Sequence, residues 1–110
     1  PDGMWDPEAL RLATQEILVN LPDPMPGFAA NRSAGLIIAG DDANFTLRGF
    51  GAGCSPRTFG HNGAGGQMSW ADPDTGLSMG FVTSGIDANF LREARRTISI
   101  ASKVADSVSG

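Results

Sequence analysis

Hydrophobic residues recur at helical spacing near both ends of the chain. In residues 6–21 the apolar positions lie three or four residues apart, which predicts an amphipathic helix with one buried stripe. The members of that stripe are Leu10, Ala13, Ile17 and Leu21. Asp6 is the expected N-cap and Pro7 the first helical residue, because an acceptor side chain and a fixed φ both favour a helix start. A Pro-rich connection without regular structure follows at residues 22–32.

A second amphipathic pattern covers residues 87–108. Asp87 is its expected N-cap. The apolar face consists of Leu91, Ala94, Ile98, Ala101, Ala105 and Val108. This spacing predicts a long helix that packs through one face.

Between the helices, the apolar residues follow the shorter spacing of strands. Residues 33–39 contain three consecutive apolar positions at 36–38, which predict a strand covered on both faces, although a buried turn of helix has the same pattern. Residues 41–44 predict a turn, and residues 45–50 predict a second, weaker strand.

Residues 67–84 predict a β-hairpin. Apolar and small or polar residues alternate on both sides of the segment 72–76, where proline and glycine suit a tight turn. Met68 and Trp70 fall on the apolar face of the first strand. We therefore expect them in the core rather than in a ligand platform.

Together these elements predict an α+β fold, in which an antiparallel sheet is packed by an N-terminal and a C-terminal helix. A length of 110 residues corresponds to one domain or part of one, so residues 1–110 are treated as a single segment. No apolar run approaches the ~20 residues that span a bilayer, so no membrane span is expected.

The charge balance argues against a nucleic-acid partner. The net charge is −4, from 12 acidic and 8 basic residues, whereas nucleic-acid binding requires a basic surface. Arg92, Arg95 and Arg96 fall on the second predicted helix together with Glu93, and we interpret them as a solvated or contact face. Cys54 is the single cysteine, so no intrachain disulfide can form, which favours a reducing compartment and a cytoplasmic location.

The candidate chemistry lies in the glycine-rich segment 59–66, which contains the only histidine, His61. Glycines beside a strand let backbone N–H groups approach a ligand closely. Phosphate-binding loops, a nucleophile elbow and a dinucleotide fingerprint are absent. One histidine and one cysteine do not form a zinc site, and we expect neither a metal nor an organic cofactor. A nucleophilic pair of Cys54 and His61 is an alternative, although no third group is evident to orient the base.

Residues 59–66, Phe-Gly-His-Asn-Gly-Ala-Gly-Gly, and the turn at 71–77, Ala-Asp-Pro-Asp-Thr-Gly-Leu, resemble the C-terminal part of the serine β-lactamase-like hydrolases. This superfamily includes β-lactamases, penicillin-binding proteins, D-aminopeptidases and carboxylesterases. Its third motif is Lys-Thr-Gly in many members and His-x-Gly in the esterase-like ones, and residues 61–63 match the second form. The resemblance is specific over 59–84 and weaker back to residue 33. It implies part of a β-lactamase-like domain and acyl transfer to water.

The resemblance also implies a role for each residue of the motif. The N–H of Ala64 matches the family's second oxyanion-hole donor, a group typically worth ~3 kcal/mol of barrier. Gly63 leaves room for a substrate acyl group to lie against the strand. His61 would assist proton transfer or hold a substrate carboxylate, and Asn62 would orient the substrate through its amide.

The sequence departs from the family at its nucleophile and base. Ser-x-x-Lys is absent, since Lys103 is the only lysine and Ile100 stands three residues before it, and the chain has no tyrosine. The first residue is Pro1 rather than a start methionine, which indicates a processed product or an excised fragment. The resemblance then implies that the partner of this chain is the missing N-terminal part and that the substrate is a small ester or amide. Such a chain is expected to be inactive alone and to associate into homo-oligomers through uncovered apolar surface.

A different class of function also fits the residues. In this alternative the chain is a small non-catalytic binding or interaction module that uses the glycine-rich loop. His61 is then a hydrogen-bonded loop histidine, and the glycines serve turns and bulges. An upstream Ser-x-x-Lys motif would favour the hydrolase, whereas a start site near Met4 would favour the binding module.

Overall fold

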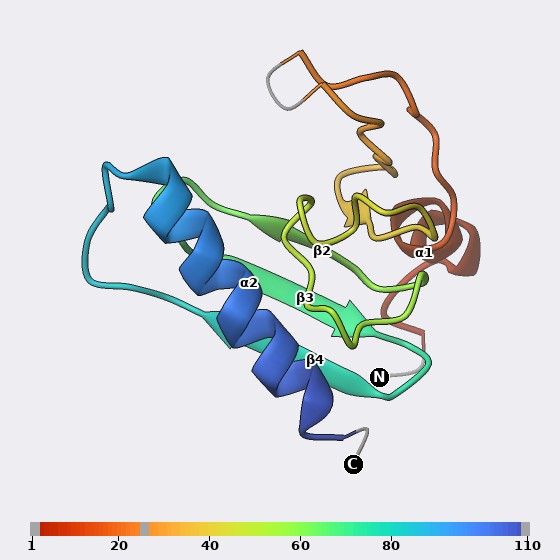
Figure 1. Cartoon of the computed structure of the whole chain (residues 1–110). Helices are drawn as coiled ribbons and strands as arrows, with labels where there is room; N and C mark the ends of the chain where they lie inside the picture. The colour runs from red at the N-terminus through yellow and green to blue at the C-terminus, as the bar shows by residue number, and fades with distance from the viewer. Residues whose placement is uncertain (1–2, 25–26, 109–110) are drawn as a thin grey trace.

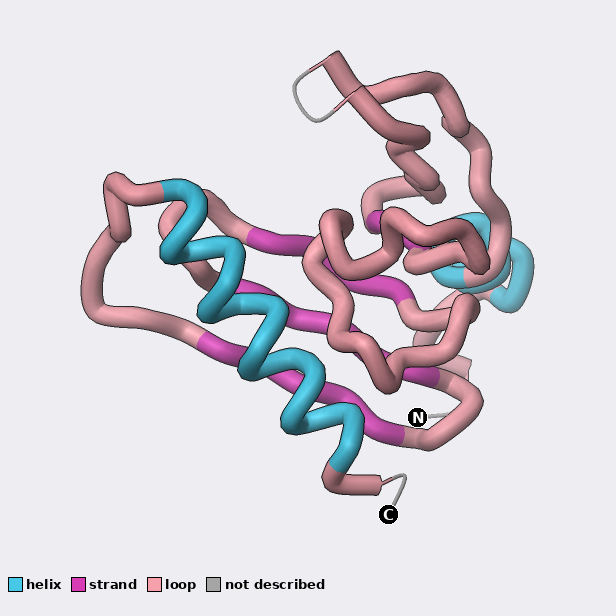
Figure 2. The backbone as a smooth tube through the Cα atoms, in the orientation of Figure 1, coloured by secondary structure: helices cyan, strands magenta, loops and turns pink. Residues whose placement is uncertain are grey.

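The computed structural model describes residues 3–24 and 27–108 (Figure 1). The elements in chain order are α1 (Pro7–Thr14), β1 (Ile37–Ile38), β2 (Phe59–Asn62), β3 (Met68–Asp72), β4 (Leu77–Phe81) and α2 (Phe90–Asp106). The strands form one antiparallel sheet in the order β1-β2-β3-β4, which confirms the predicted α+β class. Long loops connect α1 to β1 and β1 to β2 (Figure 2).

The predicted hairpin is confirmed in β3 and β4. Its register pairs Met68 with Phe81 and Asp72 with Leu77 across the expected turn. Met68 and Trp70 are each 3% exposed and belong to the core, as their alternation predicts. This hairpin provides the part of the sheet on which α2 packs.

The helix α2 lies across the face of the sheet that carries the core residues (Figure 1). The buried cluster consists of Ala39, Phe50, Met68, Trp70, Ala101 and Ala105. The loop after Phe50 is tied to α2 because the N–H of Ala52 donates to the hydroxyl of Ser102 at 2.9 Å. The core therefore joins one helix, one loop and one sheet face.

The start and the apolar face of α2 differ from the prediction. The N-cap is Asn89, whose side-chain oxygen accepts from the N–H of Arg92 at 3.0 Å. Asp87 instead accepts from the N–H of Asn89 at 2.9 Å and pairs with the Arg92 guanidinium at 2.7 Å. Leu91 and Val108, expected on the buried face, are 76% and 49% exposed. The buried residues of α2 are Thr97, Ala101 and Ala105.

The helix α1 ends at Thr14 rather than at residue 21, because the following residues pair with a distant segment. The N–H groups of Leu18 and Val19 both donate to the carbonyl of Arg32, at 2.8 and 3.0 Å. Isolated antiparallel bridges join Val19 to Arg32 and Pro22 to Ala29. In the expected connection at 22–32, the described residues 22–24 and 27–32 form no helix or strand, but they do take part in this pairing.

The predicted buried stripe of the first helix is exposed. Leu10 is 47% exposed, Ile17 38% and Leu21 72%, and α1 itself buries no residue. The helix contacts the segment before β1, where the N–H of Ala34 donates to the carbonyl of Leu12 at 3.1 Å. None of its residues belongs to the buried core cluster, so α1 contributes less to the packing of the sheet than expected. Neither α1 nor α2 is long and apolar enough to cross a membrane, within the residues that the structure describes.

The strand β1 is shorter than the predicted strand at 33–39. A tight turn precedes it, in which the N–H of Ser33 donates to the carbonyl of Leu36 at 3.0 Å and the N–H of Gly35 to the carbonyl of Ser33 at 2.9 Å. Of its two residues, Ile38 is 4% exposed and Ile37 is half-buried. Its pairing with β2 stops at Gly60.

The predicted strand at 45–50 is wrong, and a buried arginine in this segment explains the turns found instead. The side chain of Arg48 is only 2% exposed. It donates to the carbonyls of Ala29 and Ala39, at 2.9 and 2.8 Å, and to both oxygens of Asp42, at 2.6 and 2.7 Å. The segment forms turns rather than a strand because the turns bring the Arg48 side chain within hydrogen-bond distance of Ala29, Ala39 and Asp42.

A buried carboxylate closes the other end of the sheet. Asp72, the last residue of β3, is 2% exposed and accepts from the N–H and hydroxyl of Ser55, at 2.8 and 2.6 Å, and from the N–H of Asp74 at 3.0 Å. Burial works to raise the pKa of Asp72, but the hydrogen bonds from Ser55 and Asp74 outweigh it, so the pKa lies below its ordinary 3.8.

We expect Asp72→Asn to lower the free energy of unfolding at neutral pH by about 2 kcal/mol, because charge-assisted hydrogen bonds are lost. A carboxyl whose pKa is depressed in the folded state stabilises the fold fully above its unfolded pKa, and this stabilisation is lost as the pH falls through the folded value. Urea midpoints measured from about pH 7 to about pH 2 should therefore fall more steeply for the unaltered protein than for Asp72→Asn. The exposed Asp41 gives the control Asp41→Asn. Equal slopes for the unaltered protein and Asp72→Asn would contradict this account.

Candidate functional site

The strand β2 sends neighbouring side chains of the predicted motif to opposite faces of the sheet. The register pairs Asn62 with Met68, which lies in the core under α2, and pairs His61 with Ser69. Because side chains alternate along a strand, His61 lies on the face that α2 leaves open and Asn62 on the covered face. The structure therefore does not bring these two side chains together.

The His61 ring is exposed and leans toward its own backbone. Its Nδ1 lies 2.6 Å from the carbonyl oxygen of Asn62. Since a carbonyl only accepts, Nδ1 carries the proton in the neutral ring, and Nε2 keeps its lone pair. No hydrogen bond to Nε2 is formed within residues 3–24 and 27–108. His61 thus offers a free basic nitrogen at the sheet surface.

The turn between β2 and β3 carries the other predicted donor. The N–H of Gly66 donates to the carbonyl of Gly63 at 3.4 Å, and the N–H of Gly63 donates to the backbone carbonyl of Gln67 at 2.8 Å. Gly65 has a φ of 85°, the value that a type II turn requires at its third position. Ala64, at the second position, is exposed, and its N–H has no acceptor among the described residues.

The outer edge of β2 keeps an outward N–H at Asn62, whereas the Asn62 carbonyl at the same edge accepts from His61. The bond from Gly63 to Gln67 sets the ladder with β3, so the N–H groups of Gly60 and Asn62 point away from β3. The strand β1 pairs with Gly60 and stops there. An extended group of a ligand can therefore add to the sheet beside Asn62 and Ala64, at the end where His61 lies.

The amide of Asn62 lies in a small hollow of about 170 Å³ on the side of α2. A methyl group added to Gly49 would meet its Nδ2 at 1.9 Å, so the amide rests directly on the backbone of the loop before β2. Glu93 and Thr97 of α2 line the same hollow. This position lets Asn62 hold the strand against the loop and the helix.

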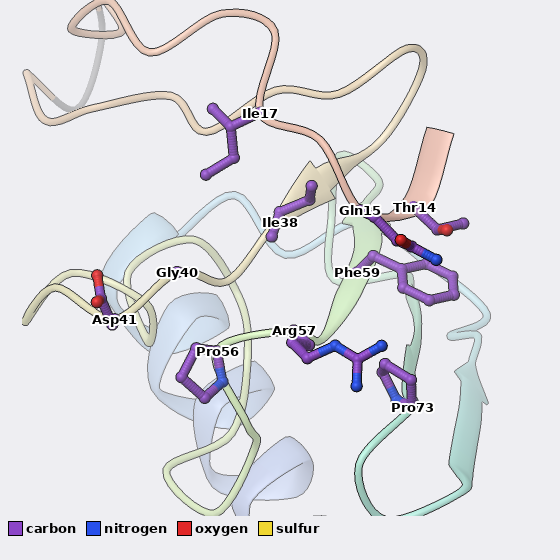
Figure 3. A pocket seen from close by; sticks show the side chains of 10 residues that line it. All are labelled: Thr14, Gln15, Ile17, Ile38, Gly40, Asp41, Pro56, Arg57, Phe59 and Pro73. Carbon is purple, nitrogen blue, oxygen red and sulfur yellow. The ribbon is translucent and has the colours of Figure 1, made fainter. Parts of the chain in front are cut away.

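Two further hollows adjoin on the open face. One, of about 390 Å³, is lined by Leu36, Phe59, His61 and Ser69 among others. The second, of about 380 Å³, lies beyond Phe59 and is drawn in Figure 3. Arg57 lines this second hollow and forms an ion pair with Asp74 at 2.7 Å. Phe59 lines both hollows, so its ring forms an apolar surface between the hollow at His61 and the hollow at Arg57.

The structure does not support a nucleophile beside His61. Ser69 stands opposite His61 in the register, yet no hydrogen bond joins their side chains within the described ranges. Cys54 packs against the core on the α2 side, and its burial raises the pKa of its thiol, the opposite of activation. No cluster of three or more metal-ligating side chains is found in the described part of the chain.

Arg96 is a residue of this site that sequence reasoning missed. Its Nη2 donates to the carbonyl of Gly65 at 3.3 Å, in the turn that carries Ala64. In the sequence, Arg96 falls among arginines interpreted as a solvated or contact face, with no partner named. The two partners are 31 positions apart and meet only because α2 packs on the sheet, so no local pattern signals the contact.

Comparison of the chain with protein-family models, with curated proteins and with solved structures finds no match.

We expect neutral His61 to carry its proton on Nδ1, because that proton is held by the Asn62 carbonyl. Long-range proton–nitrogen correlation spectra at alkaline pH should show a protonated Nδ1 and an unprotonated Nε2. His61 is the only histidine, so its ring signals need no assignment. A proton found mainly on Nε2 would show that this hydrogen bond is absent.

Proposed function

We propose that this chain supplies one wall of the acyl-transfer site of a serine β-lactamase-like hydrolase. In this proposal residues 1–110 are the C-terminal part of a larger β-lactamase-like domain, and the serine nucleophile and its base come from another part of the same protein. The substrate is a small ester or amide, with β-lactams included, and the reaction transfers its acyl group to water.

The observation that carries the proposal is the free edge of β2, where a basic nitrogen and an unpaired backbone donor occur together. A substrate carbonyl at this edge can accept from the N–H of Ala64, as the second oxyanion-hole donor of such enzymes does. The outward N–H of Asn62 can pair with an extended acyl group, beside Gly63, which has no side chain. His61 Nε2 can accept a proton from the group that attacks or hold one for the group that leaves.

The proposal gives the motif residues two kinds of role. His61 and Ala64 contact the substrate, and Gly63 leaves the space for it. Asn62 is a positioning residue, since its amide packs on Gly49 on the covered side of the sheet. The apolar hollow beside Phe59 suits the hydrocarbon part of an ester or acyl group.

The exposed apolar stripe of α1 fits the same proposal. It adjoins a hollow of about 500 Å³ with a nearly wholly apolar lining, which includes Trp5, Leu10 and Leu36. In the complete enzyme the remaining part of the domain covers this surface. When the chain is isolated, a second copy takes that place and gives a homo-oligomer.

The deciding experiment compares this chain with the product of its complete reading frame. The complete product should contain Ser-x-x-Lys and a tyrosine motif and should hydrolyse p-nitrophenyl acetate or nitrocefin. The isolated 110-residue chain should show neither turnover nor labelling by a fluorophosphonate probe. A reading frame without the serine motif would leave the non-catalytic binding module. Labelling of Ser69 or Cys54 in the isolated chain would instead show that it carries its own nucleophile.

We expect Ala64→Pro to lower kcat of the complete enzyme by about 10²- to 10³-fold, because proline has no N–H to donate to the oxyanion. Proline is well accepted at the second position of a type II turn, so the fold should be kept. Ala64→Gly is the matched control, since it alters the side chain and retains the N–H. Near-normal kcat in Ala64→Pro, with an unchanged melting temperature, would remove Ala64 from the oxyanion hole.

A further inference from the structure

The N–H of Ala64 is linked to the guanidinium of Arg96 through two peptide groups in series. Arg96 Nη2 donates to the carbonyl of Gly65 at 3.3 Å. The Gly65 carbonyl shares a peptide group with the N–H of Gly66, which donates to the carbonyl of Gly63 at 3.4 Å. The Gly63 carbonyl in turn shares a peptide group with the N–H of Ala64. Each group accepts at one end and donates at the other, so polarisation by Arg96 runs in one direction toward Ala64.

The charge of Arg96 acts on this turn and also on Asp87, whose pKa it helps to lower. A Cβ atom added to Gly66 would lie 2.2 Å from Arg96 Nη2, so the guanidinium rests against the glycine backbone. No carboxylate forms an ion pair with Arg96 among the described residues. The nearby carboxylate of Glu93 instead accepts from the hydroxyl of Thr97 at 3.0 Å. Arg96 Nε is buried and has no hydrogen-bond partner in the described part of the chain.

The turn does not depend on Arg96 alone for its shape. A Cβ atom added to Gly65 would lie 2.8 Å from a side-chain carbon of Ile86, so the segment before α2 packs on the turn as well. The bond from Gly63 to Gln67 holds its base. Replacing Arg96 should therefore change the electrostatics of the turn more than its conformation.

We propose that Arg96 is a positioning residue that holds and polarises the Ala64 N–H as a donor. The effect of Arg96 on catalysis rests on the proposed function, in which the Ala64 N–H donates to the oxyanion. Negative charge that develops on the substrate oxygen strengthens the hydrogen bond that the Ala64 N–H donates. The two peptide groups are polarised in series, so the positive charge of Arg96 stabilises that negative charge through them. The two hydrogen bonds of the relay are long, as such bonds often are before a substrate binds.

The first test uses the 110-residue chain and requires no catalysis. Arg96→Gln should move the amide proton of Ala64 upfield in proton–nitrogen correlation spectra and slow its base-catalysed hydrogen exchange. The exchange slows because a nearby positive charge stabilises the anion through which it proceeds. Arg95→Gln is the matched control, since it removes the same charge from a neighbouring exposed position of α2. Arg96→Lys retains the charge and should lie between the two.

The spectra also show whether each variant folds, so the outcome is decisive. An Ala64 amide that is unchanged in folded Arg96→Gln, or changed equally in Arg95→Gln, would overturn the role of Arg96. A change confined to Arg96→Gln supports it.

The second test uses the product of the complete reading frame. Arg96→Gln should lower kcat about two- to fivefold with KM nearly unchanged, and Arg96→Lys should restore most of the loss. Because Arg96 acts through Ala64, adding Arg96→Gln to Ala64→Pro should cost little further activity. Additive losses would overturn the relay. If this product carries no serine motif and hydrolyses nothing, the proposed function falls, while the spectra still decide the contact.

Discussion

The buried guanidinium of Arg48 is the interaction on which the first half of the fold depends. Its side chain is 2% exposed, and an unpaired charge at such a depth costs several kcal/mol. It is paired through the carbonyls of Ala29 and Ala39 and the carboxylate of Asp42, and the ring of Phe28 lies 5.5 Å from it. The hydrogen bond from Arg48 lowers the pKa of Asp42 to about 2, so this charge pair persists well into acid. Three loop segments must therefore converge on one side chain.

That convergence also sets the geometry of the candidate site. The bond from Arg48 to Ala39 fixes the end of β1, and the tight turn at 33–36 fixes its beginning, so β1 covers β2 only as far as Gly60. The edge beyond Gly60 remains free beside His61 and the turn of Ala64. On the opposite face, α2 and the loop at Gly49 hold β2 through Asn62. One end of a single strand is thus held on its covered face, while an N–H at its edge stays open.

Sequence reasoning located the glycine-rich turn and the histidine of the proposed site, but not the directions of their side chains. The glycines and the single histidine at 59–66 indicated where backbone donors and a base occur together, because both properties are local. The opposite directions of His61 and Asn62 follow from β alternation and could have been predicted once the strand was assigned. Which face α2 covers, however, depends on distant packing. The contact of Arg96 with Gly65 is of the same kind, since helix periodicity places Arg96 on a solvated or contact face without naming its partner.

The sequence by itself determined the α+β class, the β3–β4 hairpin, the core positions of Met68 and Trp70 and the approximate course of α2. Each of these depends on short-range periodicity or turn chemistry, which neighbouring residues specify. Only the tertiary structure decided where α1 ends, that residues 45–50 coil, and that the apolar stripe of α1 stays exposed. In these places local propensity competes with contacts far along the chain, such as Val19 with Arg32 and Arg48 with Ala29. A buried charge and isolated β-bridges outweigh the weak preference of a few residues for helix or strand.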